Sequence, residues 1–138
     1  FNYQRAQANG VAVALASDVG GGTSLSMFAN QADAYKVCQL QQASLSPFDS
    51  LYLCTQGAAV AMGIERQVGN LNAGSEADFI ELDMHPTPML SQRLNKASSL
   101  SEKLFAINTL GDDRVINATY VAGKQVYKKG QHYVATAV

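Results

Sequence analysis

The stretch Val11-Ala-Val-Ala-Leu-Ala-Ser-Asp-Val-Gly-Gly-Gly-Thr-Ser24 governs the interpretation of the whole chain. Its first six residues form a short, continuously apolar run, which is typical of a strand buried on both faces in a parallel sheet. Asp18 would stand at the carboxyl end of that strand, where the chemistry of α/β sheets and barrels gathers. The three glycines that follow permit a tight turn and a close approach of a ligand to the backbone. The stretch therefore predicts a functional acid at the tip of a buried strand.

Three interpretations of Asp18 and its turn are open from these residues alone. The glycines could expose backbone N–H groups to a phosphate, as in the Asp-x-Gly-Gly-Thr loops of sugar kinases and actin-like ATPases. Those loops lie inside a β-hairpin, whereas here an amphipathic helix is expected to follow. Asp18 could instead bind a metal ion or transfer protons at the end of a barrel strand. It could also simply tie down the turn or cap the next helix.

The composition limits the class of protein. The chain has 138 residues, enough for one domain, and 47% of them are hydrophobic, as a globular core requires. A net charge of -1 argues against partners such as nucleic acid or an anionic membrane surface. No apolar run is long enough to cross a bilayer, and Phe1 does not open a signal peptide, so a cytoplasmic location is expected. Since the chain lacks an initiator Met, we expect a processed or excised piece.

Residues 1–66 are expected to be mainly helical around the strand. A helix over residues 1–9 should end at Gly10, and Thr23 or Ser24 should cap a second helix that reaches about Gln42. Ser46-Pro47 with an acid in the first turn predicts a third helix, which Gly63 should end. The residues expected on the inner face of this third helix are Phe48, Leu51, Thr55, Ala58 and Met62.

Residues 67–138 are expected to form a β-rich module with a helical insert. Residues 77–83 predict a strand, and residues 89–109 predict a helix in two pieces, with Ser101 capping the second. After a turn at 111–114, a hairpin is expected from residues 115–121 and 124–127 around Ala122-Gly123, and residues 133–138 could add an edge strand.

Several conspicuous side chains are expected to be structural. Cys38 and Cys54 form no C-x-x-C pair and should be small buried thiols in a reducing compartment. Asp112 and Asp113 should make a turn or an ion pair with Arg114 instead of a second acidic site. Other side chains are expected to pack in a helix or to lie on the surface: Met27, Phe28 and Tyr35 for packing, and His85 and His132 at the surface.

Longer blocks of sequence identify a family. The chain resembles the C-terminal portion of the amidohydrolase superfamily, and within it the guanine deaminases. The most specific blocks are Leu15-Ala-Ser-Asp-Val-Gly-Gly-Gly-Thr-Ser-Leu-Ser-Met27 and Leu104-Phe-Ala-Ile-Asn-Thr-Leu-Gly-Asp-Asp-Arg114. Val68-Gly-Asn-Leu-Asn-Ala-Gly74 followed by Ala77-Asp-Phe79 is general to the superfamily. Ser75 departs from relatives that often carry Lys after the glycine.

The resemblance implies a fold and a mechanism. The fold would be α/β: residues 1–66 the C-terminal end of a TIM barrel, with its last strand and helices, and residues 67–138 part of a small flanking β-sandwich. As an isolated chain it would be α+β. Asp18 would be both a catalytic residue and a ligand of the metal, usually zinc, passing a proton from the attacking water to the leaving ammonia as guanine becomes xanthine. The glycines would leave room for the flat base.

The resemblance also implies that this chain is catalytically incomplete. The family's other metal ligands are histidines, and neither His85 nor His132 matches their positions. We therefore expect no deaminase activity and little zinc affinity from these residues alone. An exposed barrel strand would favour altered packing of residues 1–45 or a homo-oligomer. The alternatives are another amidohydrolase, acting on a different purine, a pterin or a triazine, and a non-catalytic binding or structural module.

Overall fold

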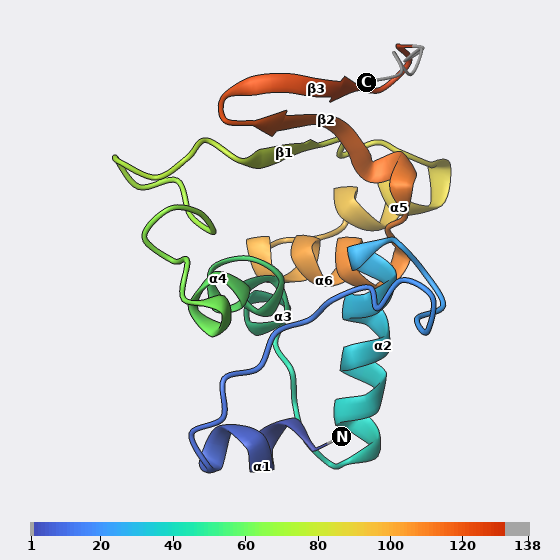
Figure 1. The fold of residues 1–138 in the computed structure, drawn as a ribbon. Helices are drawn as coiled ribbons and strands as arrows, with labels where there is room; N and C mark the ends of the chain where they lie inside the picture. Colours follow the sequence, from blue (N-terminus) through green and yellow to red (C-terminus); the bar gives the residue numbers. More distant parts are fainter. Residues whose placement is uncertain (1, 132–138) are drawn as a thin grey trace.

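The computed structural model describes residues 2–131 and shows an α+β chain with helices below one small sheet (Figure 1). The helices are α1 (Tyr3–Ala8), α2 (Met27–Leu40), α3 (Pro47–Cys54), α4 (Gln56–Met62), α5 (Pro88–Asn95) and α6 (Leu100–Leu110), with a short 3₁₀ turn at Asp113–Val115. The strands are β1 (Phe79–Leu82), β2 (Ile116–Val121) and β3 (Lys124–Lys128). The α+β class expected for the isolated chain is confirmed. None of the helices in the described part combines the length and the apolar character needed to cross a membrane.

The sheet is antiparallel, with strand order β1-β2-β3. Phe79 of β1 lies opposite Tyr120 of β2, and their rings stack with centroids 4.4 Å apart. Ala122 and Gly123 both have positive φ, as the tight turn of a two-residue hairpin requires. The predicted hairpin and the predicted strand over 77–83 are thus confirmed, although β1 is shorter than expected. The possible edge strand at 133–138 falls outside the described residues.

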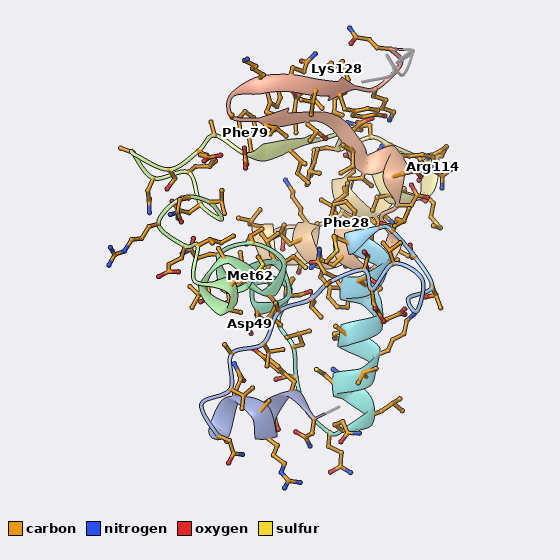
Figure 2. The ribbon with its side chains drawn as sticks, in the orientation of Figure 1. Phe28, Asp49, Met62, Phe79, Arg114 and Lys128 are labelled. Atoms are coloured by element: carbon orange, nitrogen blue, oxygen red, sulfur yellow. The ribbon has the colours of Figure 1, made fainter. Side chains whose placement is uncertain are left out.

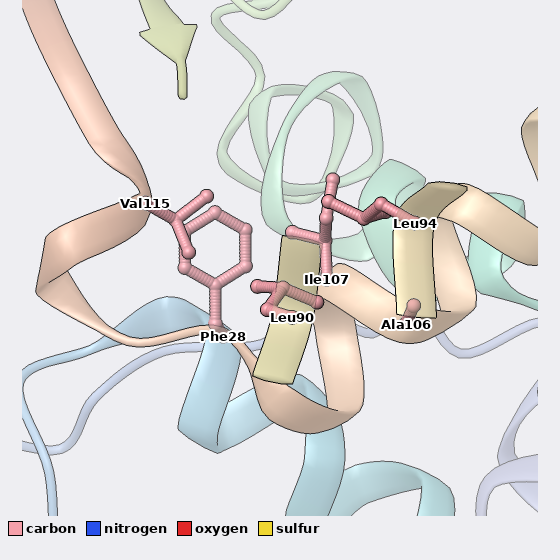
Figure 3. Packing of buried hydrophobic residues seen from close by; sticks show 6 residues of the cluster. All are labelled: Phe28, Leu90, Leu94, Ala106, Ile107 and Val115. Atoms are coloured by element: carbon pink, nitrogen blue, oxygen red, sulfur yellow. The ribbon is translucent and has the colours of Figure 1, made fainter. Parts of the chain in front are cut away.

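The main core lies between the sheet and the helices and draws on both halves of the chain (Figure 3). Phe28 of α2 packs there with residues that all come from beyond residue 66: Leu90, Leu94, Ala106, Ile107 and Val115. Leu90 and Val115 are each only 1% exposed. The packing role expected for Phe28 is confirmed, and Tyr35 of the same helix lies edge-on to Phe105 of α6 at 5.1 Å. The helices of the two halves are therefore held together by shared burial of apolar surface.

The expected strand at Val11–Ala16 is not a strand in this structure, which corrects the sequence-based prediction. Residues 11–16 run irregularly from α1 past α2, and two main-chain hydrogen bonds join them to helices, from Val11 N–H to the Ala6 carbonyl of α1 and from Leu15 N–H to the Leu53 carbonyl of α3, both at 3.0 Å. Val13 and Leu15 pack on a second core cluster around Cys38 and Leu53. Val11, in contrast, is 55% exposed. A strand needs a neighbouring strand to satisfy its backbone groups, and no described strand lies beside this segment.

The helix starts and ends were predicted with mixed success. Ser46 caps α3 through its Oγ, which accepts a hydrogen bond from Asp49 N–H, and Gly63 ends α4 in the left-handed conformation, as expected. Two predicted caps are wrong. α2 is preceded by Ser26 and not by Thr23 or Ser24, and α6 is preceded by Ser99 and not by Ser101. At α6, Ser99 is the cap because its Oγ accepts a hydrogen bond from Glu102 N–H, and the Glu102 carboxylate reaches back to Ser98 N–H, a variant of the capping box.

The inner face predicted for the third helix is wrong, and the helix is also broken. It divides at Thr55, whose backbone leaves the helical region. Beyond the break, Ala59 is only 2% exposed, whereas Met62, which is labelled in Figure 2, is 66% exposed. Phe48 is also largely exposed, at 47%. The side chains are therefore wrong on both sides of the break, since α3 buries Ser50 and Leu53 and α4 buries Gly57 and Ala59.

Candidate functional site

The Asp18 turn is held by hydrogen bonds to its own backbone. Asp18 has φ +47°, the left-handed conformation that aspartate tolerates better than most residues. Its carbonyl oxygen accepts hydrogen bonds from Gly21 N–H at 2.9 Å and from Gly22 N–H at 2.5 Å. A Cβ on Gly22 would lie 1.9 Å from the Ser17 carbonyl oxygen, so the chain can close this tightly only with glycine there. The predicted glycine turn is thus present, and its hydrogen bonds use the backbone carbonyl of Asp18 and not the carboxylate.

The turn leads directly into α2. Ser24 Oγ accepts a hydrogen bond from Ser26 N–H at 3.0 Å, and Asn30 Nδ2 donates to the Ser24 carbonyl at 3.4 Å. These bonds fix the loop against the first turn of the helix. A shallow, open hollow of about 180 Å³ lies on this loop next to Asp18, lined by Val19, Gly20, Gly22, Thr23, Ser24 and Leu25. The loop therefore offers a small open surface that begins at the residue after Asp18 and does not include Asp18 itself.

The Asp18 carboxylate is exposed and makes no hydrogen bond or ion pair within residues 2–131. It lines neither of the two larger apolar hollows. One, of about 240 Å³, lies where residues 13–16 cross α2 and includes Tyr3 and Leu53. The other, of about 580 Å³, separates α3 and α4 from β1 and includes Leu51 and Ile80. Asp18 is therefore available to bind a ligand, but the described residues build no enclosed pocket around it.

A zinc site cannot be assembled from the described residues alone. They contain no group of three or more histidine, cysteine, aspartate or glutamate side chains placed to hold one ion. A catalytic zinc ion takes three protein ligands and an open position, whereas Asp18 offers one carboxylate. His85 lies exposed in its loop, as expected, and His132 lies outside the described part of the chain. The donor set thus fits a single metal ligand and not a complete site.

The second acidic cluster is structural, as predicted. The Asp112 carboxylate accepts hydrogen bonds from the backbone and the side chain of Arg114 and caps the 3₁₀ turn that contains Asp113. The Arg114 guanidinium holds the pKa of Asp112 below its usual value. Asp112 and Arg114 form an ion pair with each other at the surface, so this cluster does not indicate a second ligand site.

The cysteines are free thiols without nucleophilic character. Cys38 is buried and Cys54 is half-buried, and neither forms a disulfide. Burial raises the pKa of both thiols, in Cys54 to about 11. Because the thiolate is the reactive form, these cysteines remain protonated near neutral pH. The prediction of free thiols is confirmed, although Cys54 is less buried than expected.

Sequence reasoning missed the polar contacts that join the helices. Gln31, Ser50 and Asn108 are polar residues at most 5% exposed, one each from α2, α3 and α6. Ser50 Oγ donates to Gln31 Oε1 at 3.1 Å, and Asn108 Nδ2 donates to the Pro47 carbonyl at 3.4 Å. Each residue looks ordinary on its own helix. No local signal predicts that three separate helices bring them together.

Comparison with known proteins identifies the family. The family model described as "Amidohydrolase family" matches residues 2–126, nearly the whole chain and the Asp18 turn included. The chain belongs to the amidohydrolase family. The resemblance expected from the motif blocks is thus confirmed at the family level.

The relatives of this amidohydrolase segment include guanine deaminases. The sequence is 41% identical over 129 residues to the guanine deaminase of Escherichia coli (strain K12) and 36% identical over 132 residues to a probable guanine deaminase of Deinococcus radiodurans. The solved structure of the E. coli enzyme superimposes with a TM-score of 0.90 over 94% of this chain. The chain spans 29% and 30% of the lengths of these two curated relatives. It therefore corresponds to a fragment of such an enzyme.

Proposed function

We propose that this chain is a segment of a zinc-dependent guanine deaminase, which converts guanine and water to xanthine and ammonia. The observation that carries the proposal is the 41% identity to the E. coli guanine deaminase over 94% of this chain, together with the TM-score of 0.90. The amidohydrolase match includes the Asp18 turn. The Asp18 carboxylate makes no hydrogen bond or ion pair with any described group, which supports a role for it in the reaction.

In this proposal Asp18 is both a metal ligand and a catalytic residue. When bound, zinc would lower the pKa of a coordinated water towards roughly 7. The Asp18 carboxylate would accept the proton of the attacking water and return it to the departing amino group, which leaves as ammonia. The remaining zinc ligands and the guanine-binding pocket would come from residues outside 2–131, because the described residues supply neither. The segment alone should therefore be inactive.

The remaining parts of the proposal concern architecture and setting. Residues 1–66 would form the closing strand and helices of a TIM barrel, and residues 67–138 part of the flanking β-sandwich. Residues 11–16 would become a strand once barrel strands lie on both sides of them. The two free thiols support a reducing, cytoplasmic location. Strongly exposed apolar side chains such as Leu25 and Leu40 support a homo-oligomer.

A chimeric enzyme tests the function directly. The 129-residue segment of the E. coli guanine deaminase that aligns with this chain would be replaced by the segment of this chain. We expect the zinc-loaded chimera to release xanthine from guanine, and Asp18→Ala to lower kcat by at least about 100-fold through loss of a ligand and proton carrier. Xanthine would be followed by its ultraviolet absorbance and ammonia by a coupled assay.

Controls separate the rival functions. Thr109→Ser, which keeps the hydroxyl that donates to the Phe105 carbonyl within α6, should retain activity. A folded, zinc-loaded chimera that hydrolyses another purine, a pterin or a triazine but not guanine would indicate a different amidohydrolase. A folded, zinc-loaded chimera without any hydrolase activity would favour a non-catalytic module and overturn the proposal.

A further inference from the structure

We propose that Gly21 is a positioning residue that sets the orientation of the Asp18 carboxylate. The inference rests on the proposed function, in which that carboxylate binds the metal and carries a proton. Gly21 itself would touch neither substrate nor metal. Its contribution is the space left by its missing side chain, which the carboxylate of Asp18 occupies.

The geometry around Gly21 supports this role. A Cβ built on Gly21 would lie 2.7 Å from Asp18 Oδ2 and 3.3 Å from Asp18 Cγ. Non-bonded atoms of this kind normally stay roughly 3.5 Å apart, so the carboxylate and a Cβ cannot both keep their places. The three nearest atoms that such a Cβ would meet all belong to the Asp18 carboxylate. A methyl group at position 21 therefore acts first on the orientation of that side chain.

The backbone hydrogen bonds of the turn keep Gly21 close to Asp18. The Asp18 carbonyl accepts hydrogen bonds from the N–H groups of Gly21 and Gly22, and these bonds hold the two ends of the turn together. Gly21 does not have positive φ, so alanine fits its backbone conformation. The side chain of Asp18 has no hydrogen-bond partner within the described residues to hold it against a push. The substitution should consequently rotate the carboxylate to another staggered position while the turn persists.

Gly20 provides a comparison inside the same turn. It has φ +103°, and a Cβ there would meet nothing within 4 Å. Alanine at position 20 strains the backbone but does not touch the carboxylate. Gly74 has φ +100° and equally open space, so alanine at position 74 causes the same kind of backbone strain in a different loop.

The orientation is tested first in the full 138-residue chain. Three-bond NMR couplings report the χ1 population of Asp18 in the wild type, Gly21→Ala and Gly20→Ala. We expect Gly21→Ala to change the dominant χ1 rotamer and Gly20→Ala to leave it in place. An unchanged rotamer in Gly21→Ala overturns the inference, whether or not the chimera is an enzyme. A crystal structure of the Gly21→Ala chimera gives a second reading of the same torsion angle.

The consequence is tested in the chimera. Gly21→Ala should weaken zinc binding and lower kcat by about 10- to 100-fold, with the melting temperature of the metal-free form unchanged. The visible spectrum of the cobalt-substituted protein should change as well, because it reports ligand geometry. Gly74→Ala should lower the melting temperature and keep zinc affinity. A loss in Gly20→Ala as large as in Gly21→Ala would assign the effect to turn strain and overturn the inference, whereas an inactive wild-type chimera would instead sink the proposed function.

Discussion

Asp18 and Asp83 show how differently two aspartates of one chain are used. The Asp18 carboxylate has no described partner and stands free beside a glycine turn. The Asp83 carboxylate accepts a hydrogen bond from Lys129 Nζ at 2.7 Å and another from His85 N–H at 2.7 Å. Lys129 also donates to the Arg114 carbonyl, so it ties the end of the hairpin to the loop after β1. A free carboxylate is suited to a ligand, and a satisfied one to holding loops together.

The Asp83 contacts predict an acid-sensitive stability. The hydrogen bond from Lys129, followed by that from His85 N–H, lowers the pKa of Asp83 below its usual value. A lowered pKa in the folded state means that the stabilisation is fully present above the usual pKa, roughly 4, and is lost as the pH falls through the lower folded value. We expect Asp83→Asn to be less stable than wild type at pH 7 and to lose less stability on acidification.

Urea unfolding at a series of pH values measures this effect. Lys129→Met should lower stability at pH 7 and should likewise reduce the stability lost on acidification, because it removes the main cause of the lowered pKa of Asp83. If wild type and Asp83→Asn lose equal stability between about pH 5 and pH 2, the contact with Lys129 does not contribute in the way proposed.

At the scale of elements, the tip of the hairpin is attached to the residues that precede β1. Ala122 N–H donates to Asp78 Oδ1 at 2.7 Å, and Gly123 N–H donates to the Ala77 carbonyl at 3.0 Å. The Ala77-Asp-Phe79 block, noticed first as a family motif, thus has a structural task in this chain. It anchors the turn between β2 and β3 to the start of β1.

Removing the acceptor at position 78 should loosen this attachment. Asp78→Ala leaves the Ala122 N–H without its partner, which should cost about 1 kcal/mol of unfolding free energy. Asp78→Asn keeps an oxygen acceptor and should lose clearly less. Denaturant unfolding of the three proteins measures the differences, and amide exchange at Ala122 localises them. Equal destabilisation by both variants would show that the charge of Asp78 matters and the acceptor does not.

The whole molecule leaves much apolar surface uncovered by its described residues. Large side chains such as Leu25 and Leu40 are 75% and 82% exposed, and the hollow between β1 and α3–α4 has a volume of about 580 Å³. Figure 2 shows side chains of the sheet facing the helices across this region. Exposed apolar surface of this kind favours association with another surface.

We therefore expect the isolated 138-residue chain to self-associate. Light scattering should give a mass above the 14.7 kDa of the monomer and rising with concentration. In the chimera the same surfaces should be covered, so the chain's own tendency to associate should disappear. A monomer at all concentrations, with residues 11–17 protected from hydrogen exchange, would contradict this expectation.

The sequence by itself determined the features that depend on neighbouring residues. Ser46-Pro47 begins α3, Gly63 ends α4, and Ala122-Gly123 turns the hairpin, because each uses hydrogen bonds or backbone preferences within about four residues. The cap at Ser99 is equally local, because Ser98, Ser99 and Glu102 make all of its hydrogen bonds. The family, too, was recognisable from blocks of sequence.

Only the tertiary structure decided burial and pairing, because both depend on residues distant in the chain. The run at residues 11–16 is apolar enough for a strand, yet it has no described strand beside it and covers one cluster with Val13 and Leu15. The ends of the helical stretch over residues 47–62 were predicted correctly, whereas the break at Thr55 and the buried residues were not. The same distinction applies to Asp18. The sequence predicted Asp18 as the functional acid. The folded turn placed its carboxylate next to Gly21, without a hydrogen-bond partner among the described residues.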